Sequence, residues 1–107
     1  MTNSFCLKHF NIELNRTPAI VDKVNKRYKQ YTKIESRCIN TLRGLSELAG
    51  FTNVQIGIAV EEVAEDFYEH SNAFDIDDKG NFDYGKLLDF YSKVVELTRL
   101  KLKGAKL

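Results

Sequence analysis

Apolar side chains between residues 17 and 49 recur at alternating intervals of three and four, and this repeat constrains the fold more than any other feature of the chain. The spacing stacks the side chains along one stripe of an α-helix. The stripe consists of Val21, Val24, Tyr28, Tyr31, Cys38, Leu42, Leu45 and Ala49. Thr17 can cap the first turn and Gly50 follows the last stripe residue, so we predict one long helix over residues 17–49. The alternative is a break near Thr32, which stands among poor helix formers.

Two shorter helices are predicted after the first. Thr52 and Gln55 have the spacing of a capping box, which predicts a second helix over residues 53–71. Its expected buried face consists of Ile56, Ala59, Val60, Val63 and Phe67. Asp83 can cap a third helix over residues 83–103. The expected inward side chains of this helix are Tyr84, Leu87, Leu88, Tyr91, Val94, Val95, Thr98 and Leu102.

These elements predict an all-α protein, a small bundle of three main helices with a long first helix and a short N-terminal arm at residues 1–16. A chain of 107 residues with 43% hydrophobic and 29% charged residues suits a single domain of this kind. The sequence has no apolar run long enough to span a membrane, and its amino terminus lacks the pattern of a signal peptide. We therefore expect a cytoplasmic protein that does not bind membranes.

Few residues are placed for catalysis or for metal binding. Cys6 and His9 have a Cys-x-x-His spacing, but a zinc site needs four ligands and only Cys38 and His70 remain. Cys38 lies on the apolar stripe, where a free thiol behaves as a small hydrophobic side chain. No arrangement of serine, histidine and aspartate indicates a nucleophile with its base. We expect a non-catalytic protein with no metal site and no cofactor.

Charge is segregated along the chain, although the net charge is only +1. Residues 16–43 include eight basic and two acidic residues, residues 61–83 include one basic and nine acidic, and residues 86–106 include six basic and two acidic. The three segments therefore carry formal charges of +6, −8 and +4. Such charges can balance one another between neighbouring helices, or they can guide association with a partner.

Protein–protein interaction is the function that these features favour. The first helix is longer than its two companions can cover, which leaves part of its apolar stripe for the arm or for a partner. We expect a regulator, inhibitor or adaptor that binds another protein or itself, for example as a homodimer. The expected partner-binding residues are Glu61, Glu62, Glu65, Asp66, Glu69, Asp75, Asp77 and Asp78, together with Phe5 and Phe10 of the arm.

Nucleic-acid binding is an alternative. Basic residues near one side of the first helix can neutralise phosphates, and Tyr28 and Tyr31 can stack on bases. The basic residues are Lys23, Lys26, Arg27, Lys33 and Arg37. Both tyrosines also belong to the apolar stripe, which favours a place for them in the core.

The segment that begins at Asp75 resembles the opening of an EF-hand calcium-binding loop. The resemblance implies a calcium site, but Lys79 and Lys86 stand where oxygen ligands are needed. The alternative for this segment is a solvated turn that caps the third helix.

Glu62 and Glu65 resemble the Glu-x-x-Glu motif of the all-α MazG-type pyrophosphohydrolases. In that family the motif faces a Glu-x-x-Asp on a later helix, and Lys86 and Asp89 take that place here. The resemblance implies a metal-dependent nucleotide pyrophosphohydrolase, in a degenerate form because a cation replaces one metal ligand.

Overall fold

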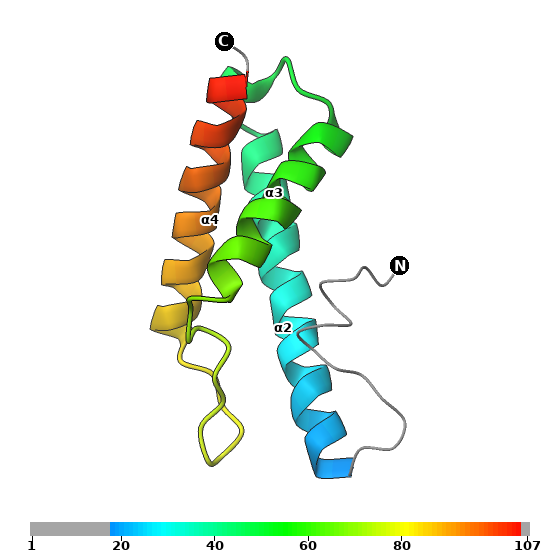
Figure 1. Cartoon of the computed structure of the whole chain (residues 1–107), viewed down its shortest axis with the longest axis vertical. Helices are drawn as coiled ribbons and strands as arrows, with labels where there is room; N and C mark the ends of the chain where they lie inside the picture. Colours follow the sequence, from blue (N-terminus) through cyan, green and yellow to red (C-terminus); the bar gives the residue numbers. More distant parts are fainter. Residues whose placement is uncertain (1–17, 106–107) are drawn as a thin grey trace.

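The computed structural model describes residues 18–105, and the side chains of residues 22–104. The main helices are α2 (Pro18–Arg43), α3 (Asn53–Tyr68) and α4 (Tyr84–Ala105), with a short 3₁₀ helix, η1 (Ser46–Leu48), after the first (Figure 1). The described residues form an all-α bundle with a long first helix, which confirms the predicted fold class. The predicted arm at residues 1–16, with Phe5, Cys6, His9 and Phe10, lies outside the described residues.

The first helix is continuous through its centre but ends earlier than predicted. Thr32 lies inside α2 and its hydroxyl donates to the carbonyl oxygen of Tyr28 at 2.8 Å, so there is no break at this position. The helix ends at Arg43 rather than at Ala49. Leu45 has extended backbone angles, φ −82° and ψ 124°, and η1 follows it. Leu48 is buried even though the α-helix has ended, because η1 turns it back toward the core. An apolar spacing of three cannot distinguish this arrangement from a continued α-helix.

The second helix begins as predicted. The Thr52 hydroxyl oxygen accepts from the Gln55 backbone N–H at 3.1 Å, and the Gln55 side chain accepts from the Thr52 backbone N–H at 2.8 Å. This is the predicted capping box, which satisfies two backbone donors at the helix start. The helix ends at Tyr68 rather than at residue 71. Its buried residues are Ile56, Ala59, Val60, Val63, Ala64 and Tyr68, while Phe67 is half-buried.

The third helix is capped as predicted, but its buried face is rotated from the one expected. The Asp83 carboxylate accepts from the backbone N–H of Gly85 at 2.9 Å. Tyr84 and Leu88 were expected to face inward and are instead 77% and 62% exposed. Phe90 is buried in their place, stacked on Phe67 of α3 with ring centroids 5.2 Å apart. The sequence of α4 is apolar on more than one side, and the contact with α3 selects the side that carries Phe90.

The segment between α3 and α4 contributes to the core, although the sequence suggested a polar connection. Ala73 and Phe74 are both buried. Ile76 and Phe82 then form an isolated antiparallel bridge, closed by a turn in which Gly80 has φ +80°. This backbone conformation favours glycine. Residues 73–82 therefore form an apolar anchor followed by a hairpin.

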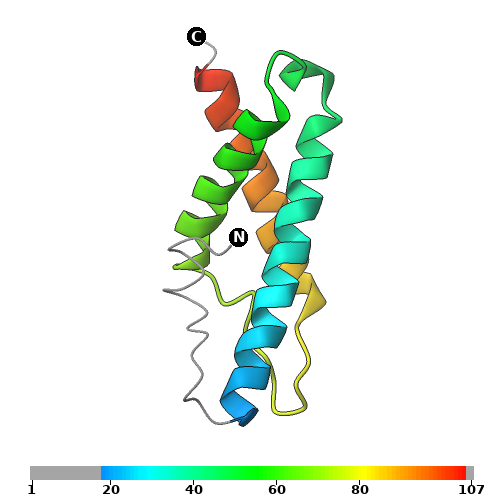
Figure 2. The ribbon, with the colours of Figure 1, turned by 90° about the vertical axis from the view of Figure 1, so that its right-hand side faces the viewer.

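The hairpin lies beside the end of α2 that projects past the other helices (Figures 1 and 2). The Lys26 ammonium donates to the carbonyl oxygen of Gly80 and lies 5.9 Å from the centroid of the Phe82 ring. Phe74 of the same connecting segment contacts Tyr31 of the apolar stripe, with ring centroids 5.6 Å apart, so the chain's own loop covers part of the stripe. Val24 and Tyr28 are half-buried and pack against the core.

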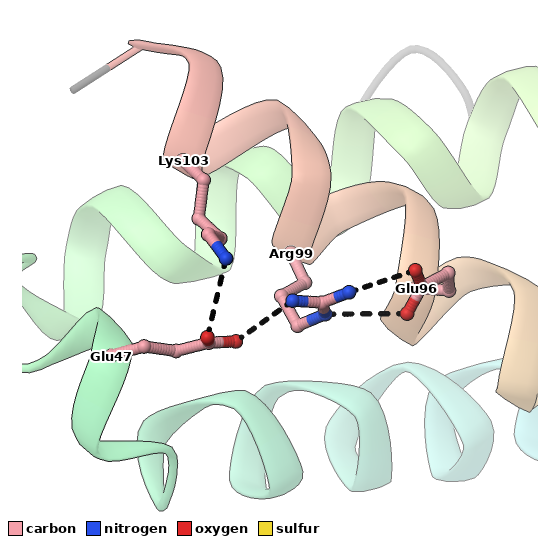
Figure 3. A network of polar contacts seen from close by, with 4 residues as sticks. All are labelled: Glu47, Glu96, Arg99 and Lys103. Atoms are coloured by element: carbon pink, nitrogen blue, oxygen red, sulfur yellow. Dashed lines mark hydrogen bonds and ion pairs between the residues drawn. The ribbon is translucent and has the colours of Figure 1, made fainter. Parts of the chain in front are cut away.

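Ion pairs join η1 to the last turns of α4. The Arg99 guanidinium bonds Glu47 at 3.1 Å and Glu96 at 2.9 Å, and the Lys103 ammonium lies 3.4 Å from Glu47 (Figure 3). The hydrogen bond from Arg99 lowers the pKa of Glu47 from its ordinary value. This network links η1 to α4, although exposed ion pairs each contribute little stability.

Proline at position 32 tests the continuity of α2. An interior helical position needs its backbone N–H and has no room for the ring, so Thr32→Pro should lower the free energy of unfolding by about 3 kcal/mol or more. Thr32→Ala keeps the helix and should change it by no more than about 1 kcal/mol. Chemical denaturation followed by circular dichroism measures both variants. Equal midpoints for the proline variant and the wild type would contradict a continuous helix.

Alanine at position 74 tests the contribution of the loop to the core. Because the Phe74 ring is fully enclosed, Phe74→Ala should lower the free energy of unfolding by about 3–5 kcal/mol. Phe82→Ala removes the same ring from a half-buried site in the same loop, and its cost should stay well below about 3 kcal/mol. A cost of Phe74→Ala as small as the one expected for Phe82→Ala, measured by the same denaturation, would contradict the core position of Phe74.

Candidate functional site

The acidic residues of α3 do not form one uniform exposed face. Glu62 and Asp66 are exposed, whereas Glu61 and Glu65 are half-buried. Glu62 lies at the α4 side and forms an ion pair with Lys101 at 3.2 Å. The charge of Glu61 acts on a carboxylate of α2. Glu69 follows the end of the helix and is exposed. The predicted acidic surface is therefore widest around Glu62, Glu65 and Asp66.

Acidic residues between α3 and α4 stabilise local structure by accepting backbone hydrogen bonds. Asp75, Asp77 and Asp78 are all exposed. One oxygen of the Asp77 carboxylate accepts from the backbone N–H groups of Lys79 and Asn81, at 2.9 and 2.8 Å. The loop and the first turn of α4 border an open cleft of about 420 Å³. The residues that line it are Asp75, Ile76, Asp77, Asn81, Phe82, Asp83 and Lys86. Asp77 thus stabilises the turn, and Asp83 caps the helix.

The residues that resemble the MazG motif are not brought together. Glu62 pairs with Lys101, close to the carboxyl end of α4, whereas Lys86 and Asp89 lie near its amino end. Helices α3 and α4 run in opposite directions, since the later Phe67 meets the earlier Phe90. Within residues 22–104, no group of three or more histidine, cysteine or acidic side chains lies close enough to hold a metal ion.

Two of the basic residues proposed for nucleic acid are engaged inside the molecule. Lys26 binds the hairpin, and the Arg27 guanidinium donates to the Tyr68 hydroxyl at 2.7 Å. Lys23 and Lys33 are exposed. Arg37 is exposed as well and lies 5.7 Å from the centroid of the Tyr91 ring.

The tyrosines proposed for base stacking belong mainly to the interior. Tyr31 is buried in the core, and Tyr28 is half-buried against it. Because Tyr31 is buried, it cannot present a ring face to a base. The basic side of α2 therefore lacks one of the two aromatic rings that the sequence suggested for stacking.

The structure reveals two apolar clefts that the sequence did not indicate. One, of about 140 Å³, lies between α2 and α4 and is lined by Gln30, Ile34, Arg37, Tyr84, Leu87, Leu88 and Tyr91. The other, of about 260 Å³, lies between α3 and the end of α4 and is lined by Phe51, Gln55, Ile58, Ala59, Glu62, Lys101 and Leu102. The sequence feature that could have indicated the second cleft is the presence of two apolar residues, Val54 and Ile58, on the polar side of an acidic helix.

Cys38 is not a reactive thiol. It is fully buried and free, and its sulfur lies 3.8 Å from the carbonyl oxygen of Tyr91. Burial is the main cause that raises the pKa of the thiol to about 12. A thiol that stays protonated is a poor nucleophile and metal ligand, so Cys38 serves as a small apolar residue.

Glu35 lies between Tyr31 and Cys38, where it interrupts the apolar stripe of α2, and it is half-buried. Burial raises the pKa of its carboxyl group, and the negative charge of Glu61 raises it further. The Tyr31 hydroxyl opposes these effects with a hydrogen bond that lowers the pKa. A charged Glu35 is therefore a cost to the folded state at neutral pH.

Glutamine at position 35 tests this carboxylate. The pKa of Glu35 is higher in the folded protein than in the unfolded chain, so the protonated carboxyl group stabilises the fold at a pH below the unfolded-state pKa. This stability is lost as the pH rises through the folded-state pKa. Glu35→Gln should therefore unfold at a higher temperature than the wild type at pH 7, and the difference should shrink in acid. Glu47→Gln should act in the opposite direction, because the pKa of Glu47 is lowered in the fold. Melting temperatures between about pH 3 and pH 8 measure both, and a Glu35→Gln variant that melts lower at pH 7 would contradict the assignment.

No helix within residues 18–105 is both long and apolar enough to cross a membrane. The chain was also compared with known proteins. It matches no family model, no curated protein and no solved structure.

Proposed function

We propose that this protein is a non-catalytic interaction module, a cytoplasmic regulator, inhibitor or adaptor that works by binding a surface of another protein or of a second copy. The observation that carries the proposal is an apolar strip on the outer side of the acidic helix. Val54 and Ile58 of α3 are 69% and 54% exposed. They lie four residues apart and Glu62 lies four residues further, so the three side chains share one side of the helix.

The strip is continuous with a cleft, and this distinguishes it from scattered surface hydrophobics. Ile58 lines the cleft of about 260 Å³ together with Leu102 of α4 and other residues. Isolated apolar side chains on a surface are ordinary, but a contiguous apolar patch rimmed by polar residues is typical of an interaction site. A partner that covers the strip would remove this apolar surface from water.

The charges around the strip support an electrostatically guided encounter. Glu62, Glu65 and Asp66 follow Ile58 by four, seven and eight residues, in the segment that carries a formal charge of −8. Complementary charge accelerates association, and salt screens the effect. The loop residues Asp75, Asp77 and Asp78 are exposed and are further partner-binding residues of this proposal. Phe5 and Phe10 of the arm belong to the proposal as well and lie outside the described residues.

Affinity purification from the native host tests the proposal. Wild-type protein should retrieve at least one protein that remains after nuclease treatment. The double variant Glu65→Lys with Asp66→Lys should retrieve at least about tenfold less, the loss that corresponds to about 1.4 kcal/mol of binding free energy. The double variant Asp22→Lys with Asp89→Lys reverses the same number of acidic charges, at exposed positions on α2 and α4, and it should behave as the wild type.

Three results would overturn the proposal. Equal retrieval by the α3 variant and the wild type would show that the acidic side of α3 is not the binding surface. Material consisting mainly of nucleic acid would favour the basic side of α2 instead. Magnesium-dependent release of pyrophosphate from a nucleotide would make the protein an enzyme.

A further inference from the structure

We propose that the groove between α2 and α4 receives the outer side of α3 from a second copy of this chain, with Ile58 of one copy seated in the groove of the next. This inference rests on the proposed function, since it names one partner for the apolar strip of α3. It uses a groove that the sequence did not indicate, although Arg37 in its lining and the nearby Lys33 are among the basic residues that the sequence proposed for nucleic acid.

The groove has the size and the lining for one apolar side chain. Ile34 and Leu87 are buried at its floor, and the exposed side chains of Tyr84 and Leu88 form its rim. Its volume is about 140 Å³. A protein cavity of about 150 Å³ holds a benzene molecule, so a branched aliphatic side chain such as that of Ile58 fits this space.

The positive charge of the groove favours an acidic surface on the partner. Within residues 22–104, the only charged side chain in its lining is Arg37. The Arg37 guanidinium carbon lies 5.7 Å from the centroid of the Tyr91 ring, and the residue is exposed. An exposed guanidinium can bind a carboxylate through two of its N–H groups. Lys33, one helical turn before Arg37, is exposed and adds a second positive charge.

The outer side of α3 has the matching pattern. Ile58 can act as the apolar anchor, and Glu62 follows it by four residues, about 6 Å along the helix axis. Arg37 follows Ile34 by three residues, about 4.5 Å along α2. The two offsets agree to within the reach of the side chains when Ile58 enters the groove beside Ile34. The present ion pair of Glu62 with Lys101 is exposed on both sides, and exchanging such a pair costs little.

The two surfaces lie on opposite sides of the molecule. Figure 1 shows α3 crossing in front of α2, and its inner side packs on both α2 and α4. Among the described residues, those that line the α2–α4 groove include none from α3. One molecule therefore cannot fill its own groove, and each copy can both offer α3 and receive it. Such head-to-tail contacts form chains whose length depends on concentration.

Sedimentation equilibrium of the full chain tests the inference. One helix in one groove is a small interface, so we expect association between about 0.1 and 1 mM. The weight-average mass should rise steadily across this range in about 10 mM salt, and much less in about 1 M salt, where the Debye length falls from about 30 Å to about 3 Å.

Charge exchange then identifies the two surfaces. Arg37→Glu alone and Glu62→Arg alone each place like charges at the contact, so both variants should remain monomeric over the same range. An equimolar mixture of the two variants should associate again, because every contact between unlike copies has opposite charges. Asp22→Arg is the matched control outside both surfaces, and it should associate as the wild type does. Circular dichroism establishes that each variant is folded.

A wild-type chain that stays monomeric at about 1 mM in low salt would overturn the inference, as would association that neither Arg37→Glu nor Ile58→Lys reduces. These failures differ from failure of the proposed function. A monomer that still retrieves another protein through Glu65 and Asp66 retains that function and loses only the second copy as its partner.

Discussion

A cluster of aromatic rings holds the three helices and the loop in one arrangement. Tyr31 comes from α2, Tyr68 from α3, Phe74 from the loop and Phe90 from α4, and all four are buried. The Phe74 ring lies at centroid distances of 5.6 Å from Tyr31, 5.4 Å from Tyr68 and 4.9 Å from Phe90. Contacts of this kind add about 0.5–1.5 kcal/mol each beyond the burial of their area. Because each ring belongs to a different segment, the crossing of the helices and the path of the loop depend on the same cluster.

The position of the loop in turn determines how the charges of α2 are used. With Phe74 anchored, the hairpin lies against the projecting end of α2 and engages Lys26. Arg27 turns toward Tyr68 at the edge of the same cluster. Two of the five cations that the sequence proposed for phosphate binding thus contact the protein's own chain. The other three, Lys23, Lys33 and Arg37, face solvent.

Part of the charge segregation is balanced within the bundle. Glu62 of α3 and Glu47 of η1 pair with basic residues of α4, so the negative and positive segments meet where the helices are neighbours. The acidic residues beyond this seam, Glu65 and Asp66, accompany the exposed apolar side chains of α3. On the opposite side, Arg37 accompanies the exposed side chains of α4. Among the described residues, the groove between α2 and α4 has Arg37 as its one charged lining residue, whereas the cleft beside Ile58 contains the Glu62–Lys101 pair. Exposed apolar side chains next to charged ones support binding proposals rather than catalytic ones.

The sequence by itself determined the elements that depend on local chemistry. The capping box at Thr52 and the cap at Asp83 follow from residue type and spacing within a few positions. The continuity of α2 through Thr32 follows from the apolar repeat on both sides of that position, and all three features are present. Only the tertiary structure decided which side of α4 is buried, because Tyr84, Leu88 and Phe90 are all apolar and the choice depends on where α3 packs. The same holds for the end of α2, where burial of Leu48 is achieved by a 3₁₀ turn, and for Phe74, whose environment comes from three distant segments. The groove at Arg37 could not be predicted for this reason, since it is bounded by residues more than 40 positions apart.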